Sequence, residues 1–285
     1  MLNRFGEFDF NDSHVQQEGS VWSEGLGQWT VIIPFHNESA YLPACLESLS
    51  RQTVRPRLIL VDNGSTDGSA GIAVKVCNSL ALDAVHVHEG TPGKVAALRR
   101  GLREVATEFV ATCDADTIYP PHYLETAGSL LDRRGVVAAV AATCAPNSTA
   151  RKARVAGLRL ELTARLLPQQ CLNGGAGQVF RTSALRGCGG FDPAIWNWVL
   201  EDHEIMARIE RLGRIAYGRT FFCQPADRPR SIDCTGWNLS EQIRYHLTTG
   251  NERWAYFHEF LGPKLRQRAL LSEKLRRCDG VPANA

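Results

Sequence analysis

The regular alternation of short apolar runs with helix-like segments between Trp29 and Cys113 most constrains how this chain can fold. Strands are predicted at residues 30–34, 57–62, 84–88 and 109–113, of which 84–88 alternates apolar and polar residues. The segments between them place apolar residues three or four apart, as in helices with one buried face, and short turns join the units. Strands that alternate with helices in this way pair in parallel. The sequence therefore predicts an α/β fold with a mainly parallel, Rossmann-like sheet covered by helices on both faces.

The pattern changes after a fifth predicted strand, at residues 136–144. The elements expected next are a basic amphipathic helix over 151–167, a glycine-rich loop at 173–177, a helix that Glu201 opens and Gly213 ends, a strand over 214–223, and helices from Trp237 onward. We divide the chain accordingly into an N-terminal extension over 1–28 that is expected to be partly disordered, a main domain over 29–225, and a basic, aromatic and helical C-terminal extension over 226–285.

Composition and charge exclude several classes of protein. A formal net charge of +2 gives no electrostatic case for nucleic acid as a partner, and hydrophobic and charged contents of 44% and 22% are ordinary for a soluble domain. The longest apolar run, residues 136–142, is too short to cross a membrane, and the N-terminus lacks the order of a signal peptide. Nine cysteines form an odd set without a C-x-x-C pair, which predicts reduced, mostly buried thiols and a cytoplasmic location.

The most informative candidate for chemistry is the pair Asp114 and Asp116, which follows the predicted strand at residues 109–113. Residues two apart in a strand point to the same side, and open α/β sheets bind ligands at the carboxyl ends of their parallel strands. Two hard oxygen ligands at that edge suit a divalent metal that carries a phosphate. Taken alone, an acidic pair at a strand end is more often a solvated turn.

Other motifs accompany the acidic pair in a fixed order. They are Pro-Phe-His-Asn-Glu at 34–38, Val-Asp-Asn-Gly-Ser-Thr-Asp at 61–67, Gly-Lys at 93–94, the loop at 174–180, Gly-Phe-Asp at 190–192 and Glu-Asp at 201–202. The ordered set spans roughly residues 29–225 and resembles the family-two glycosyltransferases of the GT-A fold. The resemblance implies an enzyme that moves a sugar from a nucleotide-diphosphate donor, usually with inversion and with Mg²⁺ or Mn²⁺. It also implies a nucleotide-sugar half over 29–120 and an acceptor half over 121–225.

The donor is expected to bind where the predicted strands end. Asp62 can accept the imide N–H of uracil, which cytosine lacks, or cap the following turn, and the two roles can coexist. Glu38 is interpreted as a carboxylate in the first turn of a helix, unless the ribose lies near it. Lys94 stands at a helix start, where it either contacts a phosphate or a base edge or is a solvated surface lysine. The residues expected to bind the donor are Pro34, His36, Glu38, Asp62, Gly93, Lys94, Asp114, Arg228 and Arg230.

The resemblance also suggests roles for the acidic residues. It assigns Asp116 to direct metal contact and Asp114 to the ribose or the metal shell, while a third ligand stays open among His203, Asp227 and Asp233. An inverting transfer needs a carboxylate that takes the acceptor proton, and Asp202 is the candidate, with Glu201 beside it. The alternative is structural, because acidic residues are also favoured at a helix start by capping and by the helix dipole. Two tryptophans just before them, Trp196 and Trp198, can stack on a sugar ring or pack in the core.

The C-terminal extension departs from the pattern of polymerising relatives. The letters of Q-x-x-R-W occur at 242–245 and 253–254 without the spacing, and no membrane spans are predicted, so processive polymer extrusion is not expected. The loop 227–230 is basic and can fold over the diphosphate or be a solvated connector. The pattern at residues 264–277 predicts a basic amphipathic helix. This helix either lies on the anionic surface of the inner membrane face or docks on the main domain.

The resulting hypothesis is a metal-dependent, non-processive, inverting glycosyltransferase that uses a UDP-sugar and a hydroxyl acceptor on a glycan, a lipid-linked molecule or a small molecule. A sugar-nucleotide nucleotidyltransferase is the first alternative, but it expects a glycine-rich loop with Arg after the first strand, and residues 34–38 contain no glycine. A dinucleotide dehydrogenase fails because no G-x-G-x-x-G follows an early strand. A non-catalytic sugar- or nucleotide-binding module is the last alternative, and it would not need Asp202.

Overall fold

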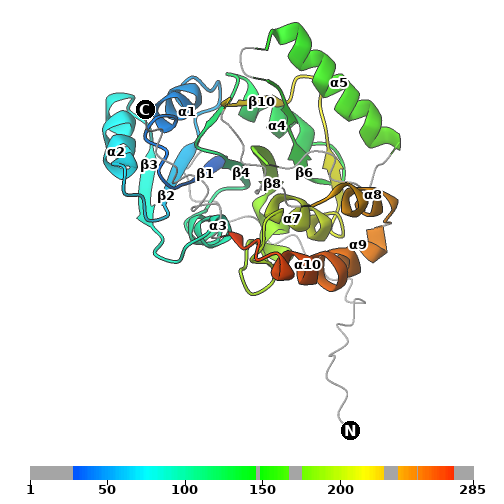
Figure 1. Ribbon diagram of the computed structural model, residues 1–285. Helices are drawn as coiled ribbons and strands as arrows, with labels where there is room; N and C mark the ends of the chain where they lie inside the picture. The colour runs from blue at the N-terminus through cyan, green and yellow to red at the C-terminus, as the bar shows by residue number, and fades with distance from the viewer. Residues whose placement is uncertain (1–27, 146–147, 167–174, 228–236, 249, 273–285) are drawn as a thin grey trace, which may run out of the picture.

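The computed structural model describes residues 28–145, 148–166, 175–227, 237–248 and 250–272. Its centre is a seven-stranded sheet in the order β3-β2-β1-β4-β8-β6-β9. The four strands predicted first form its parallel half, and their bounds are β1 (Trp29–Phe35), β2 (Arg57–Asp62), β3 (Ala84–His88) and β4 (Phe109–Cys113). The predicted α/β fold with a mainly parallel sheet is therefore confirmed, and its layers are visible in Figure 1.

Helices cover both faces of this sheet because successive residues of each strand point to opposite sides. In β1, Val31 and Ile33 pack with α1 (Leu42–Ser50), α2 (Ser69–Ser79) and α4 (Tyr123–Leu131). Ile32 faces the other side, where α3 (Lys94–Arg103), α6 (Thr182–Gly187) and α7 (Glu201–Ile209) lie. Figure 1 shows α1, α2 and α4 on one side of the sheet and α3 and α7 on the other. The inner face of α1 consists of apolar residues spaced three or four apart, as the sequence pattern indicates, and all of them are buried: Leu42, Cys45, Leu46 and Leu49.

Two of the predicted strands are each split between two sheets. The strand expected over 136–144 becomes β6 (Val136–Val140) and β7 (Ala142–Thr143), and that expected over 214–223 becomes β9 (Arg214–Ala216) and β10 (Phe222–Pro225). The first of these strands passes from one sheet to the other between Ala141 and Ala142. The Ala141 N–H still donates to the Gly177 carbonyl oxygen in β8 (Gly177–Arg181), whereas the Ala142 N–H donates to the Phe221 carbonyl oxygen. The second sheet has three strands in the order β5-β10-β7, and β5 spans Thr117–Ile118.

The C-terminal part of the chain packs on the main domain. It comprises α8 (Leu239–Leu247), a 3-10 turn (Gly250–Glu252), α9 (Arg253–Ala255), a π-helical turn (Tyr256–Leu261) and α10 (Gly262–Gln267). Together with Trp196 these elements form a third buried cluster that includes Tyr245, Phe257 and Leu265. Within the described ranges, every helix is too short or too polar to cross a membrane.

The predicted helix over 264–277 is confirmed only for residues 264–267, which lie in α10. The helix α10 ends at Gln267, and after a left-handed turn at Ala269 (φ 50°) the chain runs extended beside Asn197 and Val199. Leu265 is fully buried, and Arg268 contacts the buried carboxylate of Glu241 at 2.9 Å. Residues 268–272 are therefore docked on the domain, because their hydrogen bonds and packing partners lie there, and 273–277 lie outside the described residues.

Six cysteines lie within the described residues, and all are free thiols. Five are buried, including Cys45, Cys113, Cys144 and Cys223 in the apolar runs, and Cys188 is partly buried. Burial raises the pKa of the Cys77 thiol to about 11, which keeps it protonated at neutral pH.

Candidate active site

Lys94 lies at the centre of the candidate site, in the first turn of α3. Its Nζ is 2.8 Å from Asp114 Oδ1, just beyond β4, and 3.4 Å from Glu201 Oε1 at the start of α7. Burial works to lower the pKa of Lys94, but the carboxylates of Asp114, Glu201 and Asp202 together raise it well above its usual range. The lysine is therefore a permanent cation that joins three elements distant in the sequence. The alternative of a solvated surface lysine is wrong, since only 26% of its side chain is exposed.

The backbone that precedes Lys94 is held by Asn63, a buried residue at the end of β2. Its amide group donates to the carbonyl oxygens of Glu89 (3.0 Å) and Thr91 (2.8 Å), and its side-chain oxygen accepts from the Gly93 N–H at 2.9 Å. Gly93 has φ 122°, a conformation that side-chain-bearing residues rarely adopt. Sequence reasoning treated Asn63 only as a turn residue, because its partners lie about thirty residues away in another loop.

The predicted donor residues at the ends of β1 and β2 lie side by side, with Phe35 paired to Asp62. Asp62 Oδ1 accepts from the Ser65 N–H at 2.9 Å, which confirms the turn-capping role, and its Oδ2 lies 3.5 Å from His88 Nδ1. His36 lies at the same edge, and its Nδ1 donates to the Asn63 carbonyl oxygen at 3.1 Å. The strands β1 and β2 thus end side by side as predicted, although β1 ends at Phe35, one residue after Pro34.

Glu38 is not a first-turn helix residue. The helix α1 begins at Leu42, whose N–H bonds the Glu38 carbonyl oxygen at 2.9 Å, so Glu38 belongs to the preceding turn. The Glu38 N–H donates to Ser69 Oγ at 2.8 Å, which ties this turn to the start of α2. Pro43 near the helix start explains the difference, because proline favours the first turn of a helix and places the boundary later in the chain.

The acidic pair lies in a turn between β4 and β5, and Cys113 is the last residue of the strand. Because both residues lie outside the strand, the rule that residues two apart in a strand point to the same side does not apply to them. Asp114 pairs with Lys94, while Asp116 Oδ1 accepts from the Thr117 hydroxyl at 3.1 Å. The turn is clamped by Tyr119, whose buried hydroxyl accepts from the Asp114 N–H (2.8 Å) and donates to the Ala176 carbonyl oxygen (2.6 Å). Sequence reasoning missed Tyr119.

The region around Asp116 has the donor chemistry of a magnesium or manganese site. No group of three or more His, Cys, Asp or Glu side chains is arranged to hold a metal ion within the part of the chain that the structure describes. Mg²⁺ commonly binds through one or two carboxylates, with water and substrate phosphates filling its other positions. Asp116 is a partly exposed hard oxygen donor, and Asp114 is ion-paired with Lys94. The residues present therefore fit a metal held by Asp116, with Asp114 beside it.

The helix α7 brings two further carboxylates to the site. Leu200, which precedes it, has φ 66°, a strained conformation for a non-glycine residue of the kind that often marks functional sites. Burial raises the pKa of Glu201, against the pull of Lys94. Burial has the same effect on Asp202, but the His203 imidazole, at 3.0 Å, and Lys94 lower its pKa below the usual range. Asp202 is therefore ionised at neutral pH.

The glycine-rich loop also reaches Asp202. Gly175 has φ 88°, and a Cβ placed on it would lie 3.7 Å from Asp202 Oδ2. Gln178 in β8 donates its side-chain amide to the Asp202 carbonyl oxygen at 2.9 Å. The predicted motifs at 174–180 and 201–202 thus meet around one carboxylate, although 173 and 174 lie outside the described residues.

Other acidic and aromatic residues near α7 are structural. Glu204 and Arg208 form a buried bidentate ion pair at 2.7 and 2.8 Å, and Arg208 also bonds the carbonyl oxygens of Cys188 and Gly190. Trp196 is buried and its indole N–H bonds the Val199 carbonyl oxygen, so it packs in the core. Of the candidates for a third metal ligand, His203 contacts Asp202, Asp227 is exposed, and Asp233 lies outside the described residues. The predicted donor residues Arg228 and Arg230 also lie outside them.

The backbone nevertheless brings the start of the 227–230 loop to the acidic pair. The strand β10 pairs with β5, and the Ala226 N–H donates to the Asp116 carbonyl oxygen at 2.8 Å. A second unexpected neighbour is the C-terminal segment, since the buried Ser272 hydroxyl accepts from the Val95 N–H at 3.2 Å. The backbone N–H that follows Lys94 at the start of α3 is therefore already hydrogen-bonded within the protein.

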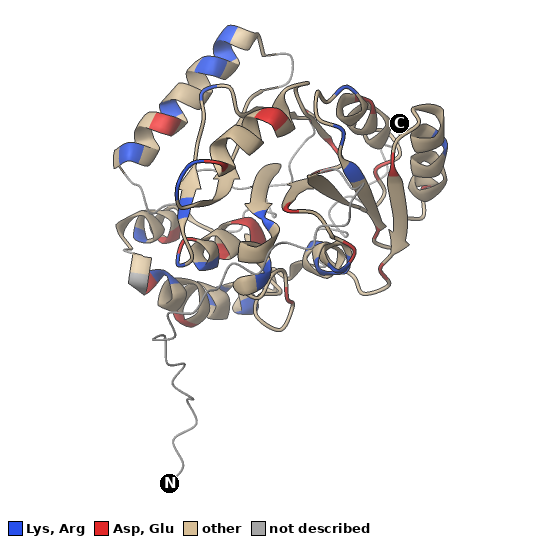
Figure 2. Ribbon diagram, turned by 180° about the vertical axis from the view of Figure 1, so that it is seen from behind, with Lys and Arg blue, Asp and Glu red and all other residues tan. Residues whose placement is uncertain are grey.

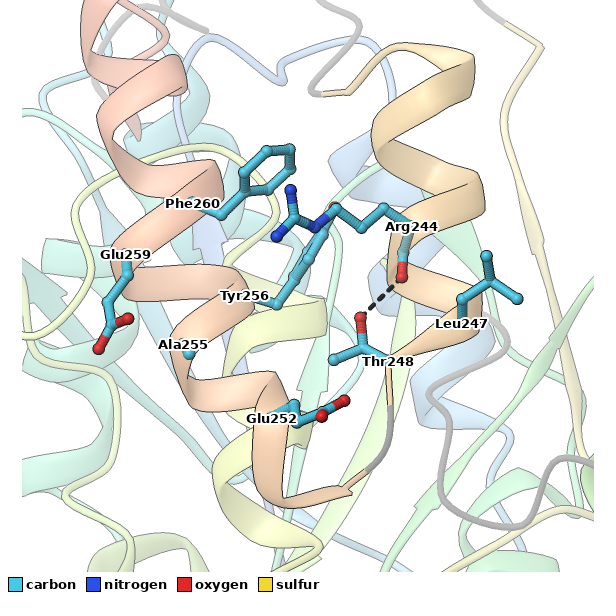
Figure 3. Close-up of a pocket in the computed structure, with 8 residues that line it drawn as sticks. All are labelled: Arg244, Leu247, Thr248, Glu252, Ala255, Tyr256, Glu259 and Phe260. Carbon is cyan, nitrogen blue, oxygen red and sulfur yellow. Dashed lines mark hydrogen bonds between the residues drawn. The ribbon is translucent and has the colours of Figure 1, made fainter.

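A separate pocket of about 580 Å³ lies between α8 and the π-helical turn. Figure 3 shows the Arg244 guanidinium over the Phe260 ring, at 3.8 Å from its centroid, with Glu252 and Glu259 on the same wall. Arg244 therefore lines this pocket and packs on an aromatic ring of it.

Comparison with known proteins identifies the family. The sequence profile described as glycosyl transferase family 2 matches residues 30–188, more than half of the 285 residues. The chain belongs to glycosyl transferase family 2. The profile match includes Asp62, Lys94 and the acidic pair and ends before Glu201. This family membership confirms the predicted resemblance and favours it over a nucleotidyltransferase.

Curated glycosyltransferases are similar to about a third of the chain. The glycosyltransferase GlyA of Streptococcus pneumoniae is 32% identical over 98 residues, which are 34% of this chain and 14% of GlyA. Human dolichyl-phosphate beta-glucosyltransferase is 33% identical over 108 residues, 34% of this chain and 32% of the enzyme. The chain thus spans less than two thirds of these relatives. In fold it is similar to the mannosyltransferase PcManGT of Pyrobaculum calidifontis (TM-score 0.64, 20% identity, 91% of this chain and 76% of the other).

Proposed function

We propose that the protein is a metal-dependent, non-processive, inverting glycosyltransferase that moves a sugar from a UDP-sugar to a hydroxyl acceptor. The observation that carries the proposal is the bridge made by Lys94, which joins Asp114 on the donor side to Glu201, the neighbour of Asp202. A non-catalytic binding module would not need an ionised carboxylate at that position. Family 2 membership supports the same reaction class.

The donor would bind at the edge formed by the ends of β1, β2 and β4. Asp62 supports uridine because its Oδ1 is used by the turn, while its Oδ2 lies 3.5 Å from the mostly exposed imidazole of His88. Lys94 supplies a cation beside the diphosphate position. The mannosyltransferase of P. calidifontis is in complex with GDP-Man and Mn²⁺, and TarS of S. aureus (TM-score 0.55, 18% identity) with UDP-GlcNAc. The uracil assignment therefore rests on Asp62 alone.

Asp116, with Asp114 beside it, would hold Mg²⁺ or Mn²⁺, which when bound offsets the negative charge of the diphosphate leaving group. Asp202 would act as the general base. Its carboxylate takes the proton of the acceptor hydroxyl while the acceptor oxygen forms a bond to the anomeric carbon. The bond from that carbon to the diphosphate breaks on the opposite face, and the diphosphate keeps the electron pair. Gly175, without a side chain, leaves room for the acceptor beside Asp202.

Two measurements test this proposal. Incubation with a panel of nucleotide sugars and Mn²⁺ should give slow, metal-dependent hydrolysis of one donor, and calorimetry should show binding of UDP in preference to CDP. Preference for CDP would contradict the Asp62 assignment and leave the reaction class standing. Absence of binding and hydrolysis for every donor would contradict the proposal as a whole.

A further inference from the structure

The helix α5 (Ala150–Leu166) lies at the edge of the molecule (Figure 1) and contacts the body along a narrow line. Of its 17 residues only Ala153 and Gly157 are buried. Gly157 is pressed against the backbone of Arg219, where an added Cβ would lie 2.5 Å from the carbonyl oxygen. Leu160 and Ala164 continue the same line and pack only partly on the core. The inner face of the helix thus consists of small residues and one leucine, Leu160.

The outer face of α5 carries a second apolar line that no described residue covers. Val155, Leu162 and Leu166 are 42%, 47% and 82% exposed. At 3.6 residues per turn these three positions share one side of the helix, opposite the line through Gly157, and the partly buried Leu158 borders them. Exposed leucines aligned in this way usually mark a contact surface.

Cations flank this outer line on both sides. Arg154 and Arg165 lie along one border of it and Lys152 and Arg159 along the other, with Arg151 near its beginning. The single carboxylate of the helix, Glu161, contacts Arg219 of the body (3.2 Å) and pairs with Arg165 of the helix itself (3.0 Å), so its charge offsets Arg165 and not the other flanking cations. Figure 2 shows the positive residues spaced along the whole length of α5.

We propose that the outer face of α5 binds an anionic lipid surface, with Val155, Leu162 and Leu166 inserted at the interface and the flanking cations on the lipid headgroups. An apolar line bordered by Arg and Lys is the pattern of helices that lie in the plane of a membrane surface. A second copy of α5 is a poorer occupant, because it would bring two rows of cations together. A nucleic acid would leave the exposed leucines without a partner.

This inference goes beyond the proposed reaction and does not depend on it. It differs from the sequence-based expectation, which placed membrane contact on the C-terminal helices, because Lys264 and Arg268 there face the buried carboxylate of Glu241. A measurement of lipid binding that needs no donor, acceptor or metal therefore tests it separately.

The experiment is co-sedimentation of the full chain with vesicles of phosphatidylcholine alone or mixed with phosphatidylglycerol. The wild type should bind only the anionic vesicles, and raising the salt from about 0.1 M to about 1 M should weaken binding because the Debye length shortens from about 10 Å to about 3 Å. The double variant Leu162→Gln/Leu166→Gln should lower the partition coefficient by roughly tenfold or more, and Arg154→Gln/Arg159→Gln should lower it and flatten the salt dependence.

The matched control is Leu239→Gln/Leu247→Gln on α8, where the two leucines are 72% and 77% exposed. It should bind like the wild type. An equal loss in this control, or no binding of the wild type to anionic vesicles, would overturn the proposal. So would a dimer in sedimentation equilibrium that the Leu162→Gln/Leu166→Gln variant abolishes, or binding of duplex RNA in place of vesicles. All four side chains are exposed, so circular dichroism should show the same fold for both variants.

Discussion

Removal of the Tyr119 hydroxyl is expected to destabilise the protein by about 2–4 kcal/mol, because each buried polar group that loses its partner costs about 1–3 kcal/mol. The hydroxyl bonds two backbone groups at once, the Asp114 N–H and the Ala176 carbonyl oxygen, and Tyr119 is only 1% exposed. Tyr119→Phe leaves both groups unpaired without changing the volume of the core. At roughly 2 °C per kcal/mol for a chain of this size, the melting temperature should fall by about 4–8 °C.

A neighbouring tyrosine provides the matched control. Tyr123 is equally buried and its ring lies 4.9 Å from that of Tyr119, but its hydroxyl has no hydrogen-bond partner among the described residues. Tyr123→Phe should therefore be within about 0.5 kcal/mol of the wild type or slightly more stable.

Urea unfolding followed by tryptophan fluorescence measures both variants, and calorimetry with UDP should show weaker binding only for Tyr119→Phe, because the turn that carries Asp114 is loosened. If the two variants proved equally stable, the clamping role of Tyr119 would be refuted.

Three further predictions concern individual carboxylates. Asp116→Asn should lower metal-dependent turnover by roughly two or more orders of magnitude while the fold stays intact, and normal turnover in added Mn²⁺ would exclude Asp116 as a ligand. Asp202→Asn should lower kcat by about two to four orders of magnitude with little change in donor affinity, and Glu201→Gln should do less; a collapse in Glu201→Gln alone would move the base one residue upstream. Asp67→Ala should lower the unfolding free energy by about 1 kcal/mol at neutral pH. Although partial burial works to raise the pKa of Asp67, hydrogen bonds from Ser69 and Ser39 hold it well below its ordinary 3.8, so this stabilisation is present above pH 3.8 and is lost as the pH falls below it. Unfolding curves for both proteins at several pH values check this, and a difference that persists in strong acid would contradict it.

Local pattern was sufficient to predict the parallel half of the sheet. The strand at residues 57–62 and the helix that buries Leu42 and Leu49 have the bounds and inner faces that hydrophobic periodicity indicates. Because the carboxyl ends of parallel strands meet at one edge, the same pattern also placed Asp62, Lys94 and the acidic pair near one another. Burial of an apolar face is a property of neighbouring residues, so the sequence carries it directly.

The contacts that complete the site depend on residues far apart in the chain. The Tyr119 hydroxyl reaches a carbonyl oxygen 57 residues later, and the Ser272 hydroxyl reaches the start of α3 across 177 residues. The strand that began at Val136 changes partner between Ala141 and Ala142, although its apolar run continues. Periodicity determines which face of a segment is buried, but the partner that each polar group and strand edge meets there is decided only when the layers pack together.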